Sequence, residues 1–121
     1  MLHKKISEVT TFLAGDETQL QELVHPKNDP ISLPYSLARA MLEPGCASLP
    51  HTLQESAELY IFTQGTGVVG CAGQEIAVAE GSVFLVPAGS EQYVRNTGQE
   101  SLVFYCVVSP PWAADQEQVN S

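Results

Sequence analysis

Basic residues are scarce in this sequence. Five Lys and Arg stand against 14 Asp and Glu, which gives a formal net charge of −9. Nucleic acids and anionic membrane surfaces are bound through clusters of Lys and Arg that displace counterions, and five basic residues are too few for an extended cluster. We therefore expect neither a nucleic-acid partner nor a membrane partner.

Long apolar runs are absent as well. None approaches the roughly 20 residues that span a bilayer, and the N-terminal stretch MLHKKISEVT has no apolar segment of the secretory kind. Three cysteines, Cys46, Cys71 and Cys106, form an odd set without C-x-x-C spacing. This pattern predicts free thiols in a reducing compartment, and hence a cytoplasmic protein.

The chain is long enough for one hydrophobic core. It has 121 residues, of which 44% are hydrophobic, and it contains no repeat, linker or low-complexity tract. We expect a single domain over residues 1–121, with its core at about 35–108.

Short β-branched and apolar runs recur at close spacing, separated by Gly, Pro and Asn turns, and no long helical pattern is present. The runs that we expect to form strands are 7–13, 19–24, 35–42, 57–64, 68–71, 75–79, 82–86, 92–95 and 102–108, with 19–24 open to a helical turn as the alternative. Such spacing is typical of an all-β sandwich or barrel. The last residues, 113–121, are expected to form a frayed or short helical tail, with Trp112 packing back on the sheets.

Two stretches carry a recognisable spacing of landmarks. The first reads Gly45, five residues, His51, one residue, Leu53, four residues, Glu58, six residues, Gly65. The second reads Gly81, five residues, Pro87, one residue, Gly89, two residues, Gln92, three residues, Asn96. In this order and at this separation they resemble the two motifs of the cupins.

The resemblance implies a cupin double-stranded β-helix, which is a small jelly-roll barrel of two sheets, here with extra N-terminal strands. The flanks SLARAMLEPG and SLVFYCVVSPPW are similar to those of small single-domain cupins often labelled mannose-6-phosphate isomerase-like.

The family typically binds a divalent metal through two His and a Glu in the first motif and a His in the second. The corresponding residues here are His51, Leu53, Glu58 and Gln92, so two imidazoles are missing. Leu53 cannot be a ligand, and Gln92 offers only a neutral amide oxygen. The remaining candidate ligands for zinc, copper, nickel, iron or manganese are His51, Glu58 and Gln92.

The alternative is a metal-free polar cluster. We expect His51 and Glu58 to project into the barrel from adjacent strands. Because side chains alternate along a strand, Tyr60 should share the inward face of Glu58. His51, Glu58, Tyr60 and Gln92 could then hold a polar ligand by hydrogen bonds, since a buried carboxylate needs partners.

Three functions follow from these alternatives. The first is binding of a small polar molecule in the barrel, with or without a weakly held metal. The second is a metal-dependent enzyme of the isomerase, oxygenase or lyase type, with Glu58 and Tyr60 as candidate catalytic residues. The third is a structural module that forms a homodimer through the apolar face of its N-terminal strands.

Other reactive residues are expected to have ordinary structural roles. His25 lies beside Pro26 and should be a surface or loop residue. Cys106 lies in the apolar run VFYCVV and should be a core thiol, whereas Cys46 should be the most exposed of the three cysteines.

Overall fold

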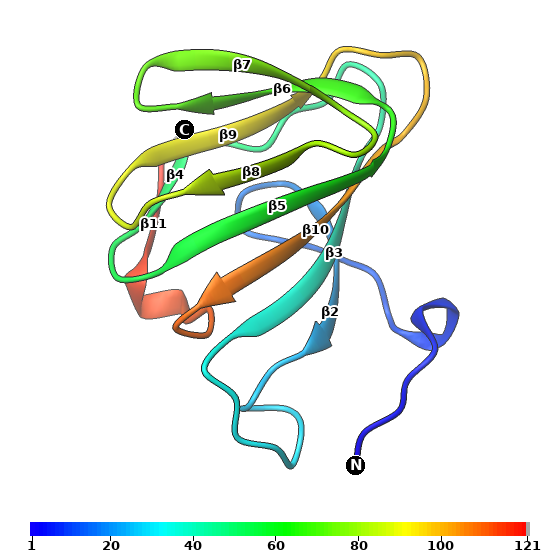
Figure 1. Cartoon of the computed structure of the whole chain (residues 1–121), viewed down its shortest axis with the longest axis vertical. Coiled ribbons are helices and arrows are strands. Elements are labelled where there is room, and N and C mark those ends of the chain that lie inside the picture. Colours follow the sequence, from blue (N-terminus) through cyan, green and yellow to red (C-terminus); the bar gives the residue numbers. More distant parts are fainter. Residues whose placement is uncertain (121) are drawn as a thin grey trace.

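Two antiparallel β-sheets pack face to face in the computed structural model, which describes residues 1–120 (Figure 1). Within these residues the helical structure is limited to two 3-10 turns, η1 (Ile6–Glu8) and η2 (Ala114–Gln116). The expected all-β double-stranded β-helix is therefore confirmed.

The larger sheet has six strands in the order β1-β2-β3-β10-β5-β8. These strands are β1 (Phe12–Leu13), β2 (Gln19–Val24), β3 (Ser36–Leu42), β10 (Leu102–Ser109), β5 (Ala57–Gln64) and β8 (Val83–Val86). β10 lies between β3 and β5, so the end of the barrel sequence completes the middle of this sheet.

The smaller sheet has five strands in the order β11-β4-β9-β6-β7. These strands are β11 (Glu117–Val119), β4 (His51–Leu53), β9 (Glu91–Asn96), β6 (Thr66–Cys71) and β7 (Gln74–Ala79). The expectation of a frayed or helical tail is wrong for residues 117–119, because β11 pairs with β4. Likewise, the expected strand at 7–13 is reduced to η1 and the two residues of β1.

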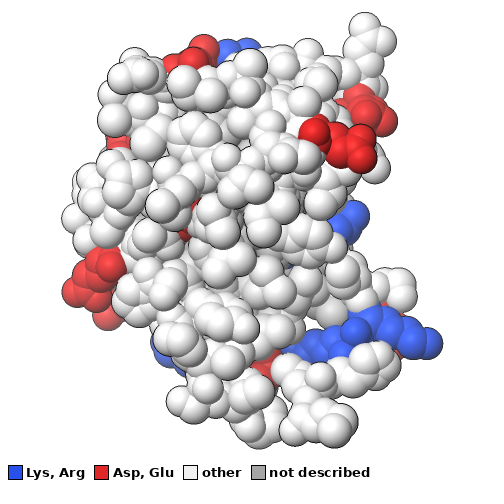
Figure 2. Space-filling model, in the orientation of Figure 1, with Lys and Arg blue, Asp and Glu red and all other residues white. Residues whose placement is uncertain are grey.

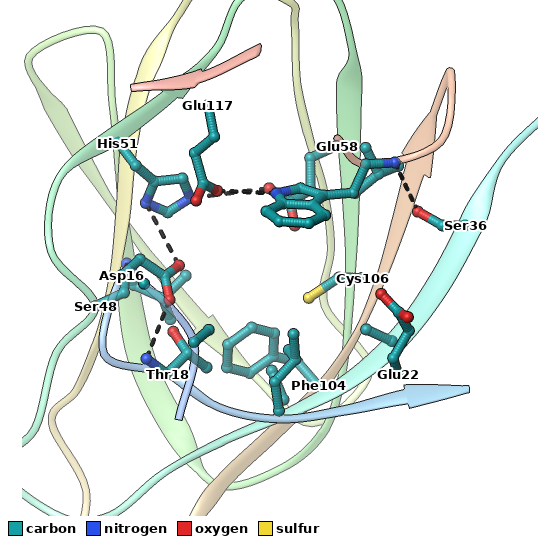
Figure 3. A pocket seen from close by; sticks show the side chains of 18 of the residues that line it. Asp16, Thr18, Glu22, Ser36, Ser48, His51, Glu58, Phe104, Cys106 and Glu117 are labelled. Carbon is teal, nitrogen blue, oxygen red and sulfur yellow. Dashed lines mark hydrogen bonds and ion pairs between the residues drawn. The ribbon is translucent and has the colours of Figure 1, made fainter. Parts of the chain in front are cut away.

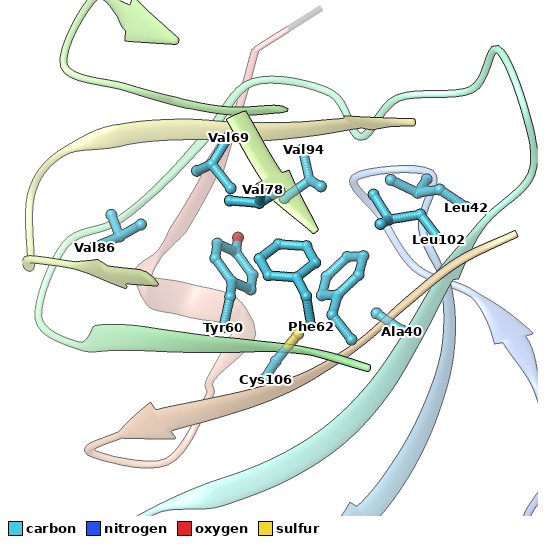
Figure 4. Packing of buried hydrophobic residues seen from close by; sticks show 11 residues of the cluster. Ala40, Leu42, Tyr60, Phe62, Val69, Val78, Val86, Val94, Leu102 and Cys106 are labelled. Carbon is cyan, nitrogen blue, oxygen red and sulfur yellow. The ribbon is translucent and has the colours of Figure 1, made fainter. Parts of the chain in front are cut away.

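An aromatic cluster fills the space between the sheets (Figure 4). Tyr60, Phe62 and Phe104 are each at most 2% exposed, and their ring centroids lie 5.0–6.0 Å apart. β5 alternates between buried and half-buried positions over Ala57–Phe62, so the inward face of this strand carries Glu58 at one end and Phe62 at the other. The core thus occupies one part of the interior and leaves the Glu58 end for polar groups.

Two motif residues have structural roles at the strand ends. Gly65 has a φ of +88°, and a Cβ atom there would lie 2.8 Å from the carbonyl oxygen of Ser101, so only Gly fits. Asn96 is buried, and its amide group donates to the carbonyl oxygens of Leu42 and Glu100. These contacts tie β9 to the end of β3.

Charged residues are dispersed over the face shown in Figure 2, where acidic groups lie at separate places near the rim and most of the area is uncharged. Among residues 1–120, no helix has the length and apolar character needed to cross a membrane.

Candidate functional site

A cavity of about 130 Å³ opens between the two sheets beside the aromatic core (Figure 3). Its polar wall includes Asp16, His51, Glu58 and Glu117. Much of the remaining lining consists of apolar and small residues of β2, β3 and β10: Leu20, Leu37, Ala38, Ala40, Phe104 and Val108. The small residues of β3 leave the space into which a ligand could fit.

His51 projects from β4 and is only 2% exposed. Its Nδ1 lies 2.8 Å from the carbonyl oxygen of Leu49 and 3.6 Å from Oδ2 of Asp16. A carbonyl oxygen can only accept, so Nδ1 carries a proton. On the other side of the ring, Nε2 lies 4.0 Å from Oε1 of Glu58. The imidazole is therefore held between two carboxylates.

Asp16 reaches His51 from the turn between β1 and β2. Its Oδ1 accepts a hydrogen bond from the backbone N–H of Thr18 at 3.1 Å, and its backbone carbonyl accepts one from Leu49 at 2.7 Å. The turn and the segment before β4 are thereby joined, and the carboxylate is positioned beside the ring. The N-terminal strands thus contribute directly to the polar wall.

Glu58, Tyr60 and Gln92 form a second buried group below His51. The Tyr60 hydroxyl donates to Oε1 of Gln92 and also lies 3.3 Å from Oε1 of Glu58. Burial, and then the nearby charge of Glu58, raise the pKa of Tyr60 well above its usual value. Tyr60 is consequently suited to hydrogen bonding and poorly suited to giving up its proton.

The pKa of His51 is raised to about 9 by its carboxylate neighbours. Burial, the largest single effect, would lower it. The interaction with Glu58, the charge of Asp16 and the hydrogen bond to Leu49 together outweigh that effect. His51 is therefore a buried imidazolium at neutral pH.

Trp112 and Glu117 form part of the cavity wall from the C-terminal segment. The Trp112 indole N–H donates to Oε2 of Glu117 at 3.1 Å, and its backbone N–H donates to the Ser36 hydroxyl at 2.9 Å. The Trp112 carbonyl accepts from Nε2 of His25 at 2.7 Å, since Nδ1 of that ring accepts the backbone N–H of Lys27. His25 lies in the loop after β2, which agrees with one of the two expected alternatives, but it is only 4% exposed and is therefore not a surface residue. Its hydrogen bond holds the Trp112 backbone.

The cysteines follow their expected exposure, with Cys46 exposed and Cys106 buried. Cys106 also reaches the cavity wall, and burial together with the charge of Glu58 raises the pKa of its thiol well above the usual value. This thiol is a poor nucleophile.

Sequence reasoning placed His51, Glu58, Tyr60 and Gln92 in one site. The first three line the cavity, whereas Gln92 lies behind Tyr60, outside the cavity lining, and pairs in register with His51. The expectation that His51 and Glu58 stand on adjacent strands is wrong, because β4 and β5 belong to opposite sheets and the two side chains meet across the interior. Asp16 and Glu117 were missed, because an acidic residue in a turn or a tail carries no specific sequence signal.

The donor set does not fit a divalent metal. A metal ligand must be deprotonated, and a proton held with a pKa of about 9 lowers the apparent affinity of an imidazole by roughly a hundredfold at neutral pH. The Gln92 amide oxygen accepts a hydrogen bond from Tyr60, and the buried Leu53 has no donor atom to offer a metal. No group of three His, Cys, Asp or Glu within residues 1–120 has the arrangement of a metal site.

The ion-paired state of His51 makes stability depend on pH. Its folded-state pKa of about 9 exceeds the ordinary value of 6.5, so the native protein binds more protons in this interval. The stabilisation, about 3 kcal/mol, is present in full below pH 6.5 and lost as the pH rises through 9. In urea unfolding, the free energy of unfolding of wild type should exceed that of His51→Gln at pH 6.5, and this difference should shrink as the pH is raised to 9. A difference between the two proteins that does not change with pH would contradict the ion pairs.

Comparison with known proteins assigns the family. Residues 38–108 match the cupin domain, which is more than half of the chain. An uncharacterized protein of Methanocaldococcus jannaschii is 23% identical over 119 residues, which cover 98% of this chain and 94% of that protein.

Solved structures share the fold at low identity. A predicted oxalate decarboxylase of Thermotoga maritima has a TM-score of 0.79 at 23% identity, over 90% of this chain and 99% of that one. Streptomyces Pac13 with uridine has a TM-score of 0.80 at 14% identity, and the match covers 100% of this chain and 92% of that one. A conserved barrel domain protein of Salinispora arenicola has a TM-score of 0.75 at 22% identity, and the match covers 96% of this chain and 92% of that one. With the family motifs, the two-sheet barrel and the matching domain in agreement, the chain belongs to the cupin family.

Proposed function

We propose that this cupin binds a small organic molecule in the cavity without the help of a metal. The observation that carries the proposal is the division of the cavity into a polar wall of buried, ion-paired side chains and an apolar wall of small and aromatic residues. Ligand sites generally combine apolar surface with a few fixed polar groups in this way.

The polar wall is pre-organised for binding. His51 is fixed at Nδ1 by Leu49 and Asp16, and Glu58 is in contact with Tyr60. Groups that are already ordered lose little conformational freedom when a ligand arrives. Oε2 of Glu58 takes no hydrogen bond from a nitrogen or oxygen of residues 1–120, so it remains available to a ligand.

The structural neighbours also support a ligand of small-molecule size. One neighbour is described as a nucleoside dehydratase and is also represented by a structure with uridine, and another is described as a predicted oxalate decarboxylase. These names concern those proteins. For this chain they support a ligand of small-molecule size, while a metal-dependent enzyme lacks the required donor set in residues 1–120.

A cavity-filling variant tests the binding site. Ala38 lines the cavity on β3, so Ala38→Leu should occupy its volume and leave every polar side chain in place. In a thermal-shift screen of small molecules with chelator present, we expect compounds that raise the melting temperature of wild type and fail to raise that of Ala38→Leu.

The matched control is Ala77→Leu, which adds the same atoms at an exposed position on β7. It should respond to ligands as wild type does, and circular dichroism should show that both variants are folded. Ligands that stabilise Ala38→Leu as well as wild type, or that bind only after a divalent metal is added, would contradict the proposal.

We also propose a homodimer through the outer face of the larger sheet. Val83 and Leu85 of the edge strand β8 are 63% and 61% exposed, and they pair with Ile61 and Leu59 of β5. Val107 of β10 continues this row beside Leu59. Two copies of a chain with a net charge of −9 can meet with least repulsion over such an uncharged patch, and an edge strand of this kind is otherwise prone to aggregation. This surface differs from the N-terminal strands that the sequence suggested.

Light scattering coupled to size-exclusion chromatography tests the dimer. Wild type should have twice the chain mass, and Leu85→Lys should have the mass of one chain because a buried, unpaired ammonium opposes association. Ile76→Lys is the matched control, since Ile76 is an exposed apolar residue of β7 in the other sheet. A monomeric wild type, or a Leu85→Lys variant that remains dimeric, would exclude this interface.

A further inference from the structure

Negative charge exceeds positive charge in the cavity lining. Three carboxylates, Asp16, Glu58 and Glu117, stand against the single imidazolium of His51, and Glu22 adds a fourth carboxylate to the lining. The lining contains no Lys or Arg. Charges in a partly enclosed, weakly screened site interact more strongly than on an open surface, so this excess favours a positive ligand and opposes a negative one.

The positive charge of His51 does not cancel the excess of negative charge in the cavity, because two carboxylates share this one cation. Asp16 lies at its Nδ1 and Glu58 at its Nε2, with separations of 3.6 and 4.0 Å. Among residues 1–120, Glu117 forms no ion pair within 4.0 Å, and its Oε2 accepts the indole N–H of Trp112. Burial, and the proximity of Asp16 and Glu58, raise the pKa of Glu117, although Trp112 and His51 oppose the rise.

Two buried polar groups retain binding capacity toward the cavity. Glu58 is 8% exposed and His51 is 2% exposed. Oε2 of Glu58 and Nε2 of His51 have no hydrogen bond to a nitrogen or oxygen of residues 1–120. Because every fully enclosed side-chain nitrogen and oxygen in these residues has a partner, the two atoms border open space. The interior therefore has polar atoms that a bound molecule could satisfy.

The remaining lining suits an apolar body. Phe104, Val108 and the small residues of β3 form one wall, and Trp112 contributes an aromatic ring next to Glu117. An ammonium near both an indole and a carboxylate gains cation–π and charge-assisted contacts together.

We propose that the cavity selects a small organic cation, an ammonium group on an apolar body, over a neutral or anionic molecule of the same shape. This inference rests on the proposed binding function and specifies its ligand class. It assigns Glu58 and Glu117 to the ammonium, Trp112 to its flank, and the wall beside Phe104 to the apolar body.

A matched set of three probes tests this selection. Benzylamine, which is protonated at neutral pH, benzyl alcohol and benzoate share one ring and differ in the charge of the head group. Isothermal titration at neutral pH, low ionic strength and with chelator present should give the tightest binding for benzylamine and the weakest for benzoate. Added salt should weaken the binding of benzylamine and leave that of benzyl alcohol nearly unchanged.

Glu117→Gln removes the charge and keeps an oxygen that can accept from Trp112. Benzylamine should bind this variant about tenfold more weakly, and benzyl alcohol should bind it as it binds wild type. Glu80→Gln, which makes the same change of net charge at an exposed turn, should bind both probes as wild type does.

The outcomes separate this inference from the function on which it rests. Equal or tighter binding of benzyl alcohol or benzoate would overturn the selection for a cation and leave ligand binding in place. Absence of binding by all three probes would overturn the inference and also contradict the proposed function. Equal loss of benzylamine binding in Glu117→Gln and Glu80→Gln would show that the protein's overall charge, and not the cavity, attracts the cation.

Discussion

The interaction on which the site depends is the clamp of His51 between Asp16 and Glu58. A protonated imidazole that is 2% exposed would be strongly destabilising without such partners. The partners come from the N-terminal turn and from the opposite sheet, so the clamp connects three parts of the chain. This clamp forms the polar wall and brings more than one carboxylate to the cavity. It also keeps a proton on each nitrogen of the His51 ring.

The same clamp explains how His51 and Glu58 can both be buried in the interior of the barrel. Leu53 packs as a buried apolar residue, and Gln92 accepts a hydrogen bond from Tyr60. His51 and Glu58 neutralise each other's charge through their own contact.

Sequence alone identified most of the fold, because the motif glycines have positive φ angles that favour Gly and the buried amide of Asn96 donates two hydrogen bonds to the backbone. Alternation along β5 likewise placed Glu58 and Tyr60 correctly on the inward face. The rest of the site was not predictable in this way. Asp16 is placed at the cavity by the contact of its turn with Leu49, and Glu117 by the pairing of β11 with β4. His25 is buried where its ring donates to the carbonyl of the distant Trp112.

The protonation state of His51 tests the central claim most directly. Nitrogen-15 NMR of imidazole-labelled protein at neutral pH, with His51→Gln used to assign the signals, reports each ring nitrogen separately. We expect both nitrogens of His51 to carry protons and their shifts to remain unchanged when one equivalent of zinc is added. A neutral ring with an unprotonated Nε2 that moves on addition of zinc would contradict the ion-paired site and restore a metal centre.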